Sequence, residues 1–228
     1  MLSEAVENYL KTVYELEQAG RRVSTNALAE RLGVKPGSVT GMIKKLAEER
    51  PRLLNYERHH GVSLTPAGRK IALEVIRHHR LIELYLQHAL GYSWDEVDAE
   101  AERLEHVISE EFEDRIAAML GQPEYDPHGD PIPAKDGTLR ERVTPILSEL
   151  QAGQAARVAR VRDDDPALLR YLADIGIVPD ATLLIAERGP FGGPLHVRVG
   201  GSPDTPAHAL SRRVTDQVYV EVLELESA

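Results

Sequence analysis

With 228 residues, 42% of them hydrophobic, the chain is long enough for one large soluble domain or for two to three small ones. No apolar run approaches the roughly 20 residues of a membrane helix, and the amphipathic start is unlike a targeting peptide. We therefore expect a cytoplasmic protein with no membrane partner. The sequence has no cysteine, which excludes disulfides and thiolate metal sites and leaves His, Asp, Glu, Asn and Met as metal ligands.

The net charge of −10 is distributed unevenly along the chain. Residues 1–75 carry twelve Lys and Arg against nine Asp and Glu, a local charge of +3. The remaining residues carry fifteen against twenty-eight, a local charge of −13, and the two values sum to −10. This asymmetry predicts different tasks for the two parts, with nucleic-acid binding placed in the mildly basic first part.

Three helices are predicted at the start of the chain. Apolar residues recur at helical spacing over residues 4–19, and Gly20 ends that helix. Ser24 or Thr25 can cap a second, shorter helix. A tight GVKPGS turn follows, and a third helix is predicted from about Ser38.

A β-hairpin is predicted next, because LLNYERHHGVSLT shows two short β-runs around a turn at His60 and Gly61. Pro66 then opens a long helix over residues 66–90. This order of elements is that of a winged helix-turn-helix DNA-binding domain, which we place at residues 1–73. An ordinary three-helix bundle with a solvated lysine face is the alternative, and the hairpin in the position of the wing favours DNA binding.

The third helix carries the side chains that we expect to contact DNA. Ser38 and Thr40 are predicted to reach bases or nearby phosphates, because short hydroxyl side chains near a helix start can enter the major groove. Lys44 and Lys45, together with Arg58 on the predicted wing, are expected to contact phosphates.

The rest of the chain is predicted to form a helical domain at residues 74–137, a linker at 138–150 and a β-rich module at 151–228. A second long helix is expected from about Trp94 to Leu120, and a further short helix within the linker. From there the sequence shows short β-runs and one helix separated by Gly/Pro turns, which indicates a small β-barrel of the SH3 type. The fold class is thus mainly α with a small β module.

A group of His and acidic residues on the predicted long helices indicates a metal site. Asp98, Glu102, Glu105 and His106 share one helix face about 100° wide, and on the preceding helix His79 and Glu83 lie four residues apart. Nitrogen and carboxylate oxygen without sulfur suit Mn²⁺ or Fe²⁺. Spacing alone leaves the alternative open, since carboxylate stripes on helices are commonly solvated faces.

Several motifs carry a family resemblance. ENYLKTVYELE, LAERLGV with SVTGMIKKL, SLTPAGRKIALEVIRHHRLIELYL, EAERLEHVISEEFEDRI and DPHGDPIP resemble the diphtheria-toxin-repressor family of metalloregulators. The resemblance runs over residues 4–135, and the last module resembles the SH3-like third domain of that family. It implies a repressor of manganese or iron homeostasis with Mn²⁺ or Fe²⁺ as corepressor and no organic cofactor. It also implies a homodimer, formed largely through the 94–120 helix, on a palindromic operator.

The resemblance assigns metal ligands position by position. It places an ancillary site at His79, Glu83 and Asp98, with Asp165 as a donor from the third domain. It places the regulatory primary site at Asn8, Glu102, Glu105 and His106. Iron-type members have Cys where this chain has Glu102, so the harder oxygen donor favours Mn²⁺. Lys11 stands where some manganese-type members have another carboxylate, which argues against their two-ion arrangement.

Other classes of function are disfavoured. The chain lacks HExxH spacing, a nucleophile elbow and a phosphate-cradling glycine loop, so we do not expect an enzyme. The glycines of RGPFGGP are interpreted as a hairpin turn. A winged-helix repressor that senses an organic ligand is the main alternative, and the β-rich module alone could dock a partner peptide.

Overall fold

The computed structural model describes residues 2–20, 22–57, 61–140, 143–162, 165–202 and 204–223. The chain divides into two compact units, and the boundary between them falls within a long helix. The first unit comprises residues 1–79, 102–115 and 133–139, and the second comprises residues 80–101, 116–132 and 140–228. None of the described helices is long and apolar enough to cross a membrane.

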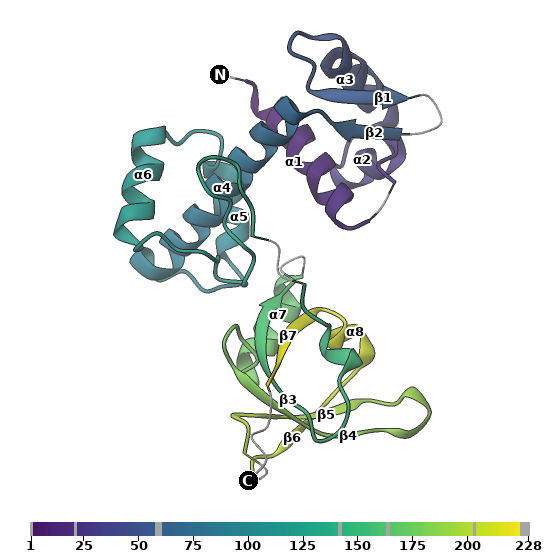
Figure 1. Ribbon diagram of the computed structural model, residues 1–228, viewed down its shortest axis with the longest axis vertical. Helices are drawn as coiled ribbons and strands as arrows, with labels where there is room; N and C mark the ends of the chain where they lie inside the picture. Colours follow the sequence, from purple (N-terminus) through teal and green to yellow (C-terminus); the bar gives the residue numbers. More distant parts are fainter. Residues whose placement is uncertain are drawn as a thin grey trace. The chain divides into compact units, whose positions relative to one another are not determined.

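The first unit contains the predicted helix-turn-helix and hairpin (Figure 1). Its elements are α1 (Glu4–Gln18), α2 (Thr25–Arg31), α3 (Pro36–Glu48), β1 (Leu54–Glu57) and β2 (Gly61–Leu64). Ser24 caps α2 as predicted, because its Oγ accepts a hydrogen bond from the amide of Ala27 at 3.1 Å. The third helix begins at Pro36, two residues before the prediction, since proline fits the first helical turn.

One hydrophobic core holds α1, α2, α3 and the hairpin together. Leu10 and Val13 of α1, Leu28 of α2 and Ile43 and Leu46 of α3 are fully buried in it. The hairpin pairs antiparallel from Leu54 with Leu64 to Glu57 with Gly61, and its tip lies outside the described residues. The helix order and the wing of the sequence prediction are therefore confirmed.

A single long helix, α4 (Pro66–Leu90), follows the hairpin, as predicted. The predicted second long helix is wrong: the structure has α5 (Val97–Leu104) and α6 (Glu110–Met119), separated by a turn. Ser109 explains the break, because its Oγ accepts from the amide of Phe112 at 3.2 Å and so caps α6. Any dimer contact through this region involves two short helices instead of one continuous helix.

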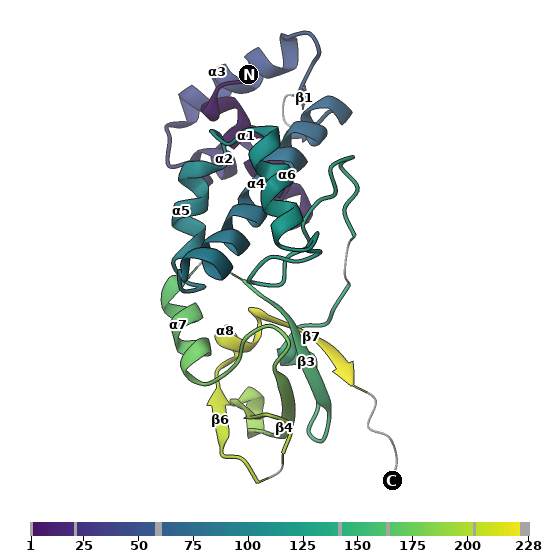
Figure 2. The ribbon, with the colours of Figure 1, turned by 90° about the vertical axis from the view of Figure 1, so that its left-hand side faces the viewer.

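The second unit contains a five-stranded antiparallel sheet with the strand order β6-β5-β4-β3-β7 (Figure 2). The strands are β3 (Ala155–Val161), β4 (Thr182–Arg188), β5 (Leu195–Val199), β6 (Ala207–Leu210) and β7 (Val218–Leu223). The helical segments are η1 (Leu147–Glu149), α7 (Pro166–Asp174), η2 (Pro190–Gly192) and α8 (Arg212–Thr215). The glycines of RGPFGGP turn the chain between β4 and β5, as predicted.

Two expectations for this unit need correction. Among the described residues the sheet is open and does not close into a barrel: β6 pairs with no strand except β5, and beyond β3 the edge strand β7 has only a single bridge, from Tyr219 to Ile146. β6 has only four residues and is largely exposed, so it is too short to bridge to the far edge. The helix expected within residues 138–150 is a single 3₁₀ turn at η1.

The core of the sheet lies between its inner face and α7, whose Leu169 and Leu172 are fully buried. Trp94, from the segment before α5, is buried in the same cluster. A smaller cluster of Leu81, Leu84 and Ile116 completes the second unit.

Candidate metal centre

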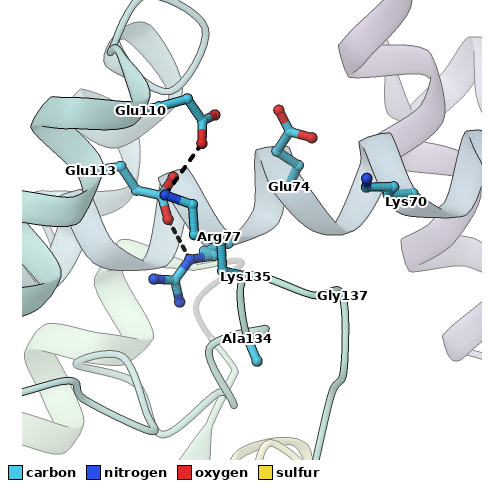
Figure 3. Close-up of a pocket in the computed structure, with 8 residues that line it drawn as sticks. All are labelled: Lys70, Glu74, Arg77, Glu110, Glu113, Ala134, Lys135 and Gly137. Atoms are coloured by element: carbon cyan, nitrogen blue, oxygen red, sulfur yellow. Dashed lines mark hydrogen bonds and ion pairs between the residues drawn. The ribbon is translucent and has the colours of Figure 1, made fainter.

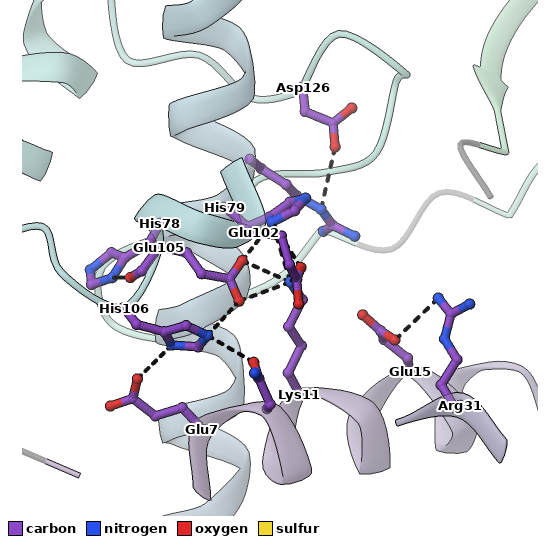
Figure 4. Close-up of polar contacts among 12 residues, drawn as sticks. Glu7, Lys11, Glu15, Arg31, His78, His79, Glu102, Glu105, His106 and Asp126 are labelled. Atoms are coloured by element: carbon purple, nitrogen blue, oxygen red, sulfur yellow. Dashed lines mark hydrogen bonds and ion pairs between the residues drawn. The ribbon is translucent and has the colours of Figure 1, made fainter. Parts of the chain in front are cut away.

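Side chains from three parts of the first unit meet around Glu105 and His106, which lie in the turn directly after α5 (Figure 4). α1 contributes Asn8 and Lys11, and α4 contributes His79. Hydrogen bonds and ion pairs connect all of these groups. The structure thus brings α1, α4 and the turn after α5 together at one polar cluster.

Glu7 holds one side of the His106 ring. Nδ1 of His106 lies 2.7 Å from Oε2 of Glu7, and since a carboxylate accepts, Nδ1 is the donor. In the neutral ring the lone pair of Nε2 then faces Oδ1 of Asn8 at 2.8 Å and Oε1 of Glu105 at 3.2 Å. Histidine ligands are held in this way, with an outer carboxylate on the second ring nitrogen that sets the tautomer.

The ammonium group of Lys11 lies among the remaining donors. Its Nζ donates to Oε2 of Glu102 at 2.7 Å and to both oxygens of Glu105, at 2.7 and 3.0 Å. Nδ1 of His79 lies 3.2 Å from the same nitrogen. Burial by itself would lower the pKa of Lys11, but the carboxylates of Glu105 and Glu102 outweigh burial and raise the pKa above its ordinary value. Lys11 is therefore a buried cation.

Glu105 is the shared member of the cluster. Burial by itself would raise the pKa of its carboxyl, but the hydrogen bond with His79 and the charge of Lys11 prevail, and the pKa is lowered. Nδ1 of His79 lies 2.5 Å from Oε2 of Glu105. Glu105 is thus held as a carboxylate, with Oε1 near His106, Oε2 near His79 and both oxygens in contact with Lys11.

The donor set fits a divalent cation. His79, Glu102 and Glu105 each offer a donor atom, and these atoms all lie within 4.8 Å of one another. Asn8 and His106 add an amide oxygen and a ring nitrogen next to Glu105. Imidazole nitrogen with carboxylate and amide oxygen is the donor chemistry of Mn²⁺ and Fe²⁺ sites.

The ancillary set predicted from the sequence is divided between the two units. His79 belongs to the first unit, whereas Glu83 and Asp98 belong to the second. His79 and Glu83 are both buried and lie one turn apart on α4, while Asp98 is exposed on α5. Binding of one ion by all three residues stays a prediction.

A second group of possible ligands lies entirely within the second unit. Glu83, Asp126 and His128 are buried, and their donor atoms lie within 4.8 Å of one another. Oδ1 of Asp126 accepts from the amides of His128 and Asp130, each at 2.9 Å. Burial and the nearby Glu83 raise the pKa of Asp126 well above its ordinary value, so a divalent cation here would relieve the repulsion of two buried carboxyl groups.

A third acidic group is satisfied by the protein's own cations. Glu113 pairs with Arg77 and lies 3.3 Å from Nε2 of His78. Lys135 pairs with Asp114 and, at 3.5 Å, with Glu110 (Figure 3). Because arginine and lysine already balance these carboxylates, this group is best explained as a structural ion-pair network.

The comparisons with known proteins agree with this architecture. The family models that match are those of the iron-dependent repressor N-terminal DNA-binding domain at residues 1–62, its metal-binding and dimerisation domain at residues 65–134, and the FeoA domain at residues 146–222. The iron-dependent repressor IdeR of Mycobacterium leprae (strain TN) is 34% identical, over 93% of this chain and 96% of the relative. The chain belongs to the diphtheria-toxin-repressor family.

Further relatives support this assignment. The diphtheria toxin repressor of Corynebacterium jeikeium (strain K411) is 31% identical over 82% of this chain and 80% of its own length. The solved structure of a manganese-dependent transcriptional repressor in complex with manganese superposes with a TM-score of 0.86 at 39% identity. That match covers 96% of this chain and all of the other. The chain is thus a metal-dependent, DNA-binding repressor with a dimerisation domain.

The repressor presents the predicted DNA-contacting side chains of α3 at its surface. Ser38, Lys44 and Lys45 are exposed, and Thr40 is half-buried, with its hydroxyl donating to the carbonyl of Pro36 at 3.0 Å. Arg58 lies outside the described residues. The DNA contacts of all five residues stay predictions.

Asp165 has a local role in the repressor. Its Oδ1 accepts from the amides of Ala167 and Leu168, at 3.0 and 3.3 Å, and so caps α7. Sequence reasoning did not find this cap, although Asp165 directly before Pro166 is a common helix start. Its predicted role as a metal ligand remains untested.

Three polar residues of the candidate sites were missed from the sequence. Glu7 lies one residue before Asn8, and helical spacing alone does not show that it reaches His106. Asp126 and His128 entered the sequence analysis only within DPHGDPIP, a motif of the family resemblance, and not as metal ligands. Their spacing of two residues within DPHGD was the available signal.

Proposed function

We propose that this repressor uses Mn²⁺ or Fe²⁺ as its corepressor and binds it first at the primary set of Asn8, Glu102, Glu105 and His106. The bound ion supplies positive charge that compensates the carboxylates. Glu7 orients His106, and Asn8 on α1 faces the same ring nitrogen as Glu105. That convergence of α1 with the turn after α5 is the observation that carries the proposal.

The consequence for DNA binding follows from where these residues lie. Asn8 belongs to the first helix of the DNA-binding domain, whereas Glu105 and His106 belong to the metal-binding and dimerisation domain. Ligands from both domains that share one ion fix the first helix against the dimerisation segment. Differential binding to this arrangement shifts the protein toward its DNA-binding state.

Manganese is the metal we favour. Glu102 provides oxygen at a position where a thiolate would favour a softer ion, and the chain has no cysteine at all. The relatives include both an iron-dependent and a manganese-dependent repressor, so both ions belong in the test.

A second ion would bind in the ancillary region. Glu83 is common to the predicted set with His79 and Asp98 and to the buried set with Asp126 and His128. We favour the buried set, because its three side chains already converge within one unit.

On DNA, we propose that the homodimer binds a palindromic operator. Two copies of α3 would then enter successive major grooves about 34–36 Å apart, with Ser38 and Thr40 near bases and Lys44, Lys45 and Arg58 near phosphates. The compartment is the cytoplasm, where such DNA lies. We assign no chemical reaction to this chain.

Operator binding measured against Mn²⁺ and Fe²⁺ titrations tests the proposal, with operator fragments selected from random DNA. We expect metal to increase affinity in the wild type, and the double variant Glu102→Ala with His106→Ala to lose that increase. Glu111→Ala is the matched control, because Glu111 is an exposed carboxylate of the same unit that forms an ion pair with the exposed Arg115 at 2.7 Å. DNA binding that ignores both metal and the double substitution would contradict the proposal and leave a non-metal ligand as the signal.

A further inference from the structure

The polar cluster of the primary site consists of two halves that share Glu105. In the first half, Nε2 of His106 lies 2.8 Å from Oδ1 of Asn8 and 3.2 Å from Oε1 of Glu105. In the second half, Nδ1 of His79 lies 2.5 Å from Oε2 of Glu105 and 3.6 Å from Oε2 of Glu102. Neighbouring donors around an octahedral ion with bonds of about 2.1 Å are roughly 3 Å apart, so each half has the donor spacing of an ion site.

A cation supplied by the protein lies in the second half. Nζ of Lys11 is 3.0 Å from Oε1 of Glu105, the oxygen that faces His106, and its other contacts are with Oε2 of Glu102, Oε2 of Glu105 and Nδ1 of His79, at 2.7, 2.7 and 3.2 Å. These are the same three atoms that define the second half. The lysine comes from α1, and Figure 4 shows its side chain reaching between the two glutamates.

We infer that Lys11 is a tethered cation that occupies the second half of the cluster, so that the primary set binds one divalent ion, through Asn8, Glu105, His106 and Oε1 of Glu102, while Lys11 holds Oε2 of Glu102. The inference rests on the proposed function, because it concerns how many ions the primary site holds. It assigns Lys11 the task of setting the stoichiometry and affinity of that site.

The charges of the cluster support a single ion. Glu7, Glu102 and Glu105 contribute three negative charges and Lys11 one positive charge, which leaves −2 with neutral histidines. The nearby Glu15 is balanced by Arg31 at 3.6 Å. One divalent cation makes the cluster neutral, whereas a second would place excess positive charge beside a buried ammonium.

A structural consequence concerns the protein before it binds metal. Lys11 joins α1 to Glu102 and Glu105, and Glu7 of the same helix holds His106, so α1 is linked to the α5 segment without any ion. The ion then has to organise only Asn8 and His106. Lys11 thus lowers the repulsion among the carboxylates in the metal-free protein.

The charge reversal Lys11→Glu tests the inference on the full-length protein with Mn²⁺ alone. We expect the variant to bind one Mn²⁺ more per chain than the wild type by equilibrium dialysis. We also expect electron paramagnetic resonance to show an exchange-coupled pair, since ions in a shared two-metal site lie about 3.5–4 Å apart. Lys70→Glu is the matched control, because Lys70 is an exposed lysine on α4, and it should leave both the count and the spectrum unchanged.

Lys11→Met provides a second test if the charge reversal prevents folding. It removes the ammonium but keeps an apolar stem, so the single Mn²⁺ should bind about tenfold more tightly than in the wild type. An unchanged or weaker affinity, no additional ion in Lys11→Glu, or a coupled pair already present in the wild type would overturn the inference. If no Mn²⁺ binding by the wild type depends on His106, the proposed function is contradicted instead.

Discussion

At the scale of single residues, Glu7 is the least conspicuous member of the metal centre. It ligates nothing in the proposal and acts through His106, whose Nδ1 it holds at 2.7 Å. Removing such an outer partner typically lowers metal affinity by 10- to 100-fold, because the ring loses its fixed tautomer and orientation.

We therefore expect Glu7→Ala to weaken Mn²⁺ binding by about 10- to 100-fold, measured by isothermal titration calorimetry. Glu4→Ala is the control, since Glu4 is an exposed carboxylate in the first turn of the same helix. Equal affinities for the two variants would show that Glu7 has no positioning role.

Glu105 makes the stability of the metal-free protein depend on pH. Its pKa is lowered in the folded protein, so the ionised form stabilises the fold above the unfolded pKa of about 4.3, and this contribution is lost as pH falls through the folded pKa. At pH 7, Glu105→Gln leaves Lys11 with one carboxylate fewer and should cost about 3 kcal/mol of unfolding free energy.

Urea unfolding in the presence of a chelator measures this effect. The difference between the wild type and Glu105→Gln should be largest near neutral pH and should shrink below about pH 4. A difference that stays constant from pH 7 to pH 3 would mean that packing, and not the charge, accounts for the loss.

At the scale of elements, the junction between the hairpin and α4 brings two backbone segments into close contact at Gly68. A Cβ on Gly68 would overlap the carbonyl oxygen of Leu53, so the start of α4 fits there only with glycine. Gly41, in the middle of α3, has open space around the same position. A side chain at Gly68 would therefore clash with the backbone, whereas a side chain at Gly41 would not.

We expect Gly68→Ala to destabilise the protein by about 2 kcal/mol or more, because backbone cannot move aside as a side chain can. Gly41→Ala should raise stability by about 0.5–1 kcal/mol, because alanine loses less conformational entropy in a helix. Thermal unfolding of both variants decides the matter, and a stable Gly68→Ala protein would refute the close contact.

At the scale of the whole molecule, the FeoA module is not a detachable appendage of the second unit. Trp94, which precedes α5, is buried in the same hydrophobic cluster as Leu147, Leu150 and the inner face of the sheet. It is the only tryptophan of the chain, so its fluorescence reports on this cluster alone.

Truncation after residue 150 should therefore shift the emission of Trp94 to longer wavelength, because the tryptophan loses its apolar cover. Truncation after Leu223 is the control and should leave the spectrum unchanged. An unshifted spectrum in the shorter protein would mean that Trp94 is buried by other contacts. A loss of DNA binding in the truncated protein would therefore follow from the lost packing around Trp94 as well as from the missing module.

The sequence by itself determined the local elements and the kinds of donor atoms. Helical periodicity and caps such as Ser24 specify the first three helices, because both act over neighbouring residues. The absence of cysteine excludes thiolate ligands, and Glu102, Glu105 and His106, close together in the chain, offer nitrogen and oxygen donors. The helices, their caps and the kinds of donor atoms depend only on residues that are close together in the chain.

Tertiary structure decided which side chains meet. The open edges of the sheet and the contacts of Glu7 and Lys11 with residues about a hundred positions away follow from packing. The family resemblance implies that Lys11 stands where some manganese-type members have a carboxylate, but only the folded chain shows its ammonium among His79, Glu102 and Glu105. Contacts between distant segments depend on how whole elements pack, and local spacing contains no information about that.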